Sequence, residues 1–173
     1  MTSIVDCNSS FRPCLFLFLL TVLTCLSLPL RADSLNIETR AYVYDPETRS
    51  HIYQNAVATW DNMTLESSEI RFFPEKNTAI AKGYVRFRRD KVLVVADRFE
   101  LFLGSHAIFY NAILYDSQNR VYVTAEEIMW IGYREEGNYY VLKQCTFTTC
   151  NPKDPVWEIS GSRIDYVEQN LGS

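Results

Sequence analysis

A two-strand unit that recurs along the chain constrains its fold more than any other feature. The first strands of three units carry Asn-Ala-Val at 55–57, Gly-Tyr-Val at 83–85 and Asn-Ala-Ile at 111–113, at a spacing of 28 residues. Each is followed by a second strand of the form apolar, any, small, polar, any, apolar. These second strands begin at Leu65, Val94 and Val123, and a fourth copy begins at Ile159. Such recurrence is typical of a fold built by stacking one supersecondary unit.

Hydrophobic periodicity assigns the repeats to strands. From Ile52 onward apolar residues alternate with polar ones, and β-branched and aromatic residues dominate. This period of two is typical of half-buried strands, and no segment holds a helical period for three turns. Turn residues separate the runs at 60–62, 74–77, 89–90, 116–119 and 135–138. The sequence therefore predicts an all-β domain over 52–173, preceded by an N-terminal segment over 33–51.

The interior of that domain is predicted to be apolar. One strand pair cannot bury its apolar face alone, so stacked pairs are expected to form a continuous folded-over sheet. The small residue in each second strand allows a bend. Two interiors fit the pattern: a filled β-sandwich core, or an open V-shaped or jelly-roll sheet whose groove holds an acyl chain. The inward positions that would line such a groove are Val57, Leu65, Ile70, Val85, Phe87, Val94, Phe99, Leu101, Ile113, Val123, Ile128, Ile159 and Ile164.

Residues 1–32 are predicted to be a secretory signal peptide. Residues 14–30 hold no charge, Arg12 precedes them, and Ala32 stands at the expected cleavage position. An uncleaved membrane anchor over the same run and a lipoprotein attached through Cys25 are the alternatives. In all three interpretations the domain is exported. In an exported protein Cys145 and Cys150 are open to oxidation.

Residues suited to catalysis or metal binding are few. His51 and His106 each stand alone, and we expect surface or capping roles for both. The paired carboxylates at 126–127 and 135–136 would point to opposite faces of a strand, so neither forms an acid–base couple. With 17 Lys and Arg against 21 Asp and Glu, the net charge of −4 disfavours a nucleic-acid partner. The sequence predicts no enzyme, no metal site and no cofactor.

The most unusual string runs from Cys145 to Trp157. It holds two cysteines and then Asn151, Pro152, Asp154, Pro155 and Trp157. Asn-Pro and Asp-Pro favour a rigid turn, after which Trp157 would open the next inward-facing strand. Five residues apart, Cys145 and Cys150 would point to opposite faces of a regular strand. A disulfide between them would need a bulge, because their Cα atoms must come within about 7 Å. Both remain disulfide candidates, and Cys150 is available to a partner elsewhere.

The repeats, the leader and the 150–157 string resemble the N-terminal periplasmic domain of the LptD family of lipopolysaccharide-assembly proteins, also called organic solvent tolerance proteins. The unit from Gly83 to Phe99 resembles the OstA-like module shared with LptA and LptC. The resemblance covers about 52–166 and implies an OstA/LptA-like β-jelly roll. The cysteine that the family carries close after its signal peptide is missing, because no cysteine lies between Asp33 and Gln144.

The resemblance also implies a function and partners. The module would accept lipopolysaccharide acyl chains, dock by an edge strand with an LptA-like bridge protein, and pass lipid to a C-terminal barrel plugged by an LptE-like lipoprotein. Cys150 matches a position that pairs with a barrel cysteine. The protein would lie in the periplasm, associated with the outer membrane. Because the chain stops before any barrel, we expect a fragment, a truncated frame or a stand-alone module.

Other interpretations stay open beside lipid transport. A secreted structural or adhesive β-sandwich would have a dry, filled core and would bind no amphiphile. An LptC-like or LptA-like periplasmic bridge module is another alternative, and an anchored leader over 14–30 would favour an LptC-like inner-membrane module. A hydrolase has no nucleophile or acid–base set to support it.

Overall fold

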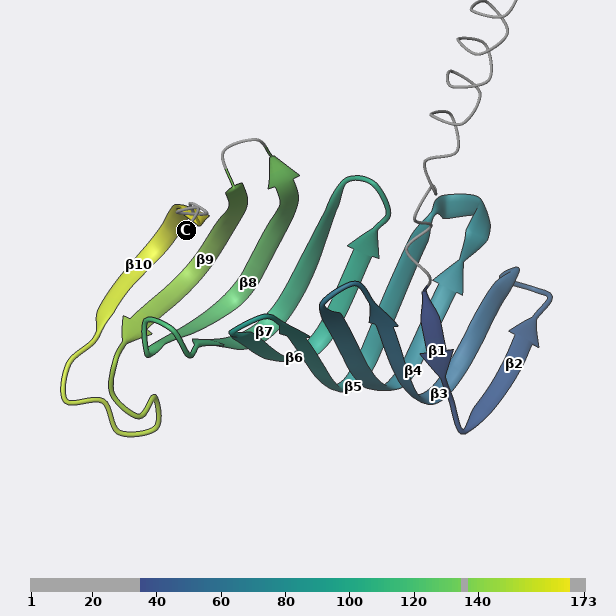
Figure 1. The fold of residues 1–173 in the computed structure, drawn as a ribbon, viewed down its shortest axis with the longest axis horizontal. Helices are drawn as coiled ribbons and strands as arrows, with labels where there is room; N and C mark the ends of the chain where they lie inside the picture. The colour runs from purple at the N-terminus through teal and green to yellow at the C-terminus, as the bar shows by residue number, and fades with distance from the viewer. Residues whose placement is uncertain (1–34, 135–136, 169–173) are drawn as a thin grey trace, which may run out of the picture. The chain divides into compact units, whose positions relative to one another are not determined.

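The computed structural model describes residues 35–134 and 137–168, and within these ranges the chain forms a 10-stranded antiparallel sheet (Figure 1). The strands are β1 (Asn36–Glu38), β2 (Ala41–Asp45), β3 (Ser50–Trp60), β4 (Met63–Phe73), β5 (Thr78–Arg89), β6 (Val92–Phe102), β7 (His106–Asp116), β8 (Val121–Arg134), β9 (Gly137–Thr148) and β10 (Ile159–Glu168). A short 3-10 helix, Pro74–Lys76, joins β4 to β5. The all-β prediction is confirmed. The predicted signal peptide lies outside the described residues.

Strand order follows the chain from β3 to β10, so every step is a hairpin. At the start of the sheet β1 pairs with the end of β3, while β2 pairs with its beginning. The segment 33–51 thus contributes two strands to the sheet. Runs of three and five residues are too short for alternation to reveal them. In the part of the chain that the structure describes, no helix has the length and apolarity needed to cross a membrane.

Cross-strand register aligns the inner side chains into two rows that run across the strands. Row A consists of Tyr53, Ile70, Ala81, Phe99, Phe109, Ile128, Leu142 and Ile164. Row B consists of Ala58, Leu65, Phe87, Val94, Leu114, Val123, Phe147 and Ile159. Phe87 of row B lies 5.3 Å from Phe109 of row A between ring centroids, although their strands are not neighbours. The sheet is therefore folded over, with the two rows facing each other.

A line of bulges, here called the crease, separates the two rows. Asn55, Tyr84, Asn111 and Gln144 have positive φ values, between 46° and 52°. The residue after each is buried and lies opposite a small residue: Ala56 opposite Ser67, Val85 opposite Ala96, Ala112 opposite Ala125, and Cys145 opposite Gly161. A bulge bends its strand and increases the local twist. The small residues predicted to allow a bend are those at the crease.

Ser67 shows how the crease satisfies its backbone. Its hydroxyl donates to the carbonyl oxygens of Glu69, at 2.9 Å, and Lys82, at 2.8 Å. Register between β4 and β5 shifts at this point, between Glu66 and Glu69. The short hydroxyl of Ser67 thus offers a hydrogen-bond partner to backbone carbonyls where the ladder is irregular.

The bulges overturn two predicted positions. Val57 and Ile113 lie on the outer face: Val57 pairs with Glu66, and Ile113 is 42% exposed beside Val95. The left-handed residue in each first strand shifts the side-chain alternation by one, so that Ala56 and Ala112 point inward instead. The 28-residue spacing predicted that Gly83 is equivalent to Asn55. In the structure the equivalent of Asn55 at the crease is Tyr84.

Aromatic rings fill the interior between the middle strands. Phe99 and Phe109 are fully or almost fully buried, with centroids 4.8 Å apart, and Phe87 packs against both. Trp60 and Trp130 close over Phe87 at 6.2 and 5.9 Å. Each buried ring contributes roughly 1.5–3 kcal/mol relative to exposure. In this region the interior is a filled core.

Replacing Asn55 by isoleucine tests the crease. Asn55 is exposed and has a φ of 48°, so a β-branched side chain there strains the backbone without disturbing the core. The expected cost is about 1–2 kcal/mol of unfolding free energy, measured by chemical denaturation. Asn55→Gly is the control and should lose none of that stability, because glycine accepts a positive φ. Equal destabilisation by both variants would contradict the role given to the crease.

Candidate functional site

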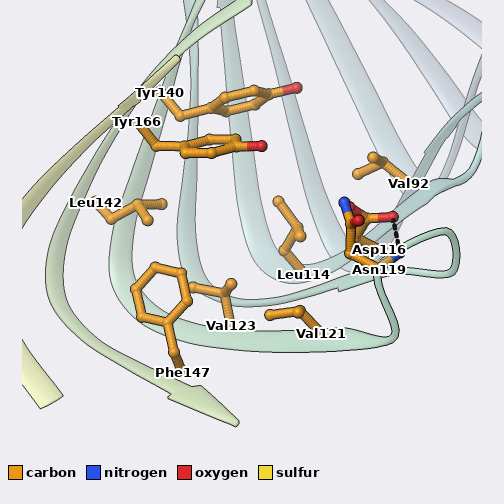
Figure 2. Close-up of a pocket in the computed structure, with 10 residues that line it drawn as sticks. All are labelled: Val92, Leu114, Asp116, Asn119, Val121, Val123, Tyr140, Leu142, Phe147 and Tyr166. Carbon is orange, nitrogen blue, oxygen red and sulfur yellow. Dashed lines mark hydrogen bonds between the residues drawn. The ribbon is translucent and has the colours of Figure 1, made fainter. Parts of the chain in front are cut away.

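An apolar pocket of about 420 Å³ lies between the two layers towards the β10 end of the sheet (Figure 2). It is lined by Val92, Leu114, Asp116, Asn119, Val121, Val123, Tyr140, Leu142, Phe147 and Tyr166. These residues come from β6 to β10 and from the turn between β7 and β8. The volume falls within the range of pockets that hold small ligands.

A change in side-chain size along the rows creates the pocket. Between β5 and β7 the rows supply Phe87, Phe99 and Phe109. From β7 onward the pocket-lining members of the rows are Leu114, Val123 and Leu142, which are smaller, together with Phe147. The spacing of the layers is maintained by the filled core beside them, so shorter side chains leave space between the layers.

Two pairs of polar groups border this apolar space. Tyr140 and Tyr166 are stacked, with ring centroids 6.2 Å apart, and Figure 2 shows their hydroxyls pointing in the same direction. Asp116 and Asn119 form the other pair, in which the Asn119 side-chain amide donates to the Asp116 carboxylate at 2.6 Å. The backbone amides of Gln118 and Asn119 also donate to that carboxylate. The pocket thus combines apolar walls with fixed polar groups, an arrangement suited to an amphiphile.

The thirteen predicted groove positions divide into three sets. Val123 lines the pocket. On the inner face the structure buries Leu65, Ile70, Val85, Phe87, Val94, Phe99 and Ile128 within the core, packs Leu101 and Ile164 against it, and leaves Ile159 62% exposed in β10. Val57 and Ile113 lie on the outer face, as described above. Most of the inward positions therefore form a core.

Sequence reasoning missed the pocket residues of β9 and β10. Tyr140, Leu142 and Phe147 were assigned no role, and neither was Tyr166. The sequence does contain a signal for them. Apolar residues alternate at 140 and 142, and the alternation resumes at 145 and 147 after Gln144, which has a positive φ. A further repeat aligned on the crease, with Cys145 equivalent to Ala112, would have found them.

The two cysteines in the described part are free and differ in environment. Cys145 is buried at the crease, where its thiol donates weakly to the Gly161 carbonyl, and burial raises its pKa. Cys150 follows β9, is partly exposed, and donates its backbone amide to the Thr148 hydroxyl. The predicted turn forms, with Lys153 donating to the Asn151 side chain. Trp157 is 44% exposed and precedes β10, so the prediction that it opens an inward-facing strand is wrong.

The histidines and carboxylates have local partners. His51 lies 2.7 Å from the Tyr42 hydroxyl, and His106 stacks on Phe102 with centroids 4.5 Å apart. Glu127 accepts from Lys143 at 2.6 Å, and Glu126 is exposed. The second carboxylate pair, 135–136, lies outside the described residues. Among residues 35–134 and 137–168 no three His, Cys, Asp or Glu side chains are grouped to hold a metal ion.

A folded-over, repeated antiparallel sheet with an apolar interior is the LptA-like β-jelly roll, and a solved structure shares it. LptH from Pseudomonas aeruginosa is described as the LptA homologous periplasmic component of a lipopolysaccharide transport device. It superposes with a TM-score of 0.51 at 11% identity, covering 58% of this chain and 78% of LptH. This likeness establishes the fold alone, and it confirms the predicted fold class.

The sequence resembles a particular assembly protein. LPS-assembly protein LptD from two Xylella fastidiosa strains, Temecula1 and 9a5c, is 26% identical over 118 residues, or 68% of this chain. The matched stretch spans 14% of those relatives. The resemblance to LptD predicted from the repeats and the Cys150 string is thus confirmed. No family model matches the chain.

Thiol labelling tests the environments of the two cysteines. Under native conditions iodoacetamide should modify Cys150 and leave Cys145 unmodified, because a buried thiol with a raised pKa presents little thiolate. Peptide mapping by mass spectrometry distinguishes the two sites. In denaturant both should react. Modification of Cys145 as fast as Cys150 in the folded protein would contradict this placement.

Proposed function

We propose that this chain is a periplasmic module of lipopolysaccharide transport and that its pocket binds lipopolysaccharide acyl chains. The observation that carries the proposal is the apolar pocket with polar groups at its border. Similarity to LptD and the fold shared with LptH support the choice of ligand. A role in lipid handling requires no catalytic group.

The energetics of the pocket suit a ligand that must bind and then leave. Each buried methylene contributes about 0.8 kcal/mol, so an acyl chain gains affinity from length alone. Few polar atoms border the walls, and no charged partner has to be exchanged as the chain moves. The filled core around Phe87 and Phe99 limits this binding to the β6–β10 region. We propose that the chain enters from β10, where the inner-face residue Ile159 is 62% exposed.

The edges of the sheet are the proposed contacts with partners. The inner rows continue to β10, the last strand that the structure describes, and β1 and β2 form the other end. An added strand at either edge would extend the rows, and one at the β10 edge would also extend the pocket. We propose an LptA-like bridge protein and an LptD-type barrel with its LptE-like lipoprotein as partners. Cys150 is accessible enough to pair with a barrel cysteine, and the protein would lie in the periplasm at the outer membrane.

A secreted structural β-sandwich is the second candidate function. The filled aromatic core between β5 and β7 is what that hypothesis predicts. That hypothesis does not predict the open pocket, because a purely structural domain gains stability by filling such a space. The two hypotheses therefore differ in what the pocket binds.

Photo-crosslinking at neighbouring positions of β9 tests the proposal. Phe147 lines the pocket, whereas the adjacent Thr146 lies on the outer face opposite Ser160. A photoreactive phenylalanine analogue at 147 should crosslink purified lipopolysaccharide, and the same analogue at 146 should give little product. Gel shift and lipopolysaccharide immunoblotting provide the readout.

Val94 supplies the matched internal control. It belongs to the same row as Phe147 but is 2% exposed within the filled core, so the analogue there should crosslink weakly in a folded protein. Equal crosslinking at 146 and 147 would indicate surface adsorption. No product at 147 in a folded protein would favour the structural β-sandwich and overturn the transport proposal.

A further inference from the structure

Trp130 and Arg89 bridge the two layers next to the pocket. Trp130 follows Ile128 of row A by two residues in β8. It belongs to a line of register partners, here called rim A: Leu101, Ala107, Trp130, Tyr140 and Tyr166. Arg89 lies in the equivalent line beyond row B, here called rim B: Trp60, Met63, Arg89, Val92, Asp116 and Val121. The Arg89 guanidinium lies over the Trp130 ring, 5.2 Å from its centroid.

This bridge coincides with the end of the pocket on both rims. Tyr140, the partner of Trp130 on rim A, lines the pocket, and so does Val92, the partner of Arg89 on rim B. Neither Trp130 nor Arg89 lines it, so the pocket stops where they meet. Trp130 also packs on Phe87 at 5.9 Å, which joins the bridge to the filled core.

A longer ligand on rim A would meet the Trp130 ring first, before it reaches the filled core around Phe87. The next residue on rim A is Ala107, which is buried but small, and Leu101 follows it. Removing the indole would leave new space between the pocket and Ala107, whose own side chain is only a methyl group. Neighbouring strands are roughly 4.8 Å apart, so the extension corresponds to several methylenes.

We propose that Trp130, held by Arg89, is the closed end of the pocket and sets the length of acyl chain that it accepts. This inference rests on the proposed function, since it assigns a specificity-determining residue to the same pocket. Arg89 is a positioning residue: its cation–π contact holds the indole across the gap, and its side chain is only 17% exposed. Chains that exceed the distance from β10 to Trp130 would leave their remaining methylenes in water.

Calorimetric titration of the whole protein with alkyl maltosides, from octyl to hexadecyl and below their micelle concentrations, tests the proposal. In the wild type, affinity should rise about fourfold per added methylene, the equivalent of about 0.8 kcal/mol, and then reach a plateau. In Trp130→Ala the rise should continue to longer chains. Trp157→Ala removes an exposed tryptophan outside the pocket and should keep the wild-type plateau.

Three further variants complete the test. Trp130→Leu retains apolar packing if the alanine variant does not fold, and it should move the plateau in the same direction by a smaller amount. Arg89→Met should also lengthen the accepted chain, whereas Arg89→Lys should restore the plateau by retaining the cation. An unchanged plateau in the folded Trp130 variants would overturn this inference alone. No binding of any alkyl maltoside to the wild type would overturn the proposed function as well.

Discussion

The structure depends on one backbone constraint, which is that each strand must bend at the crease. A left-handed residue in each first strand shifts the side-chain alternation, and a small residue opposite it lets the layers approach. Asn55 with Ser67 and Asn111 with Ala125 show the arrangement at two places in the sheet. Without the bend the apolar face of each hairpin would remain in water. With it, a single sheet buries both halves of that face against each other.

Once the sheet is folded over, side-chain volume decides what its interior becomes. Rings of Phe87, Phe99 and Phe109 fill the space between the middle strands. Leu114, Val123 and Leu142 line the pocket together with aromatic residues of β9 and β10, and Trp130 marks the boundary between the two regions. A filled core and a ligand pocket are therefore not alternatives for this fold. The filled region maintains the layer spacing that the open region requires.

Periodicity and repetition predicted the all-β fold, the small residues at the bend and most inward positions. The failures have local causes. Val57 and Ile113 were placed inward because alternation alone does not reveal a left-handed residue in the strand. The pocket depends on volumes summed across non-adjacent strands, which a linear pattern does not contain. The position of Trp130 at the end of the pocket could not be predicted for the same reason, because its contact with Arg89 joins opposite rims of the folded sheet.

We propose that lipid occupies the β6–β10 end of the interior and not its middle. Methyl NMR of the protein titrated with lipid A measures this directly, because methyl groups of the same row report both regions. Resonances of Leu114, Val123 and Leu142 in the pocket should shift and saturate, while those of Val94 and Ile128 in the core should stay nearly unchanged. Shifts confined to outer-face methyls such as Ile113, or spread equally through core and pocket, would contradict the account.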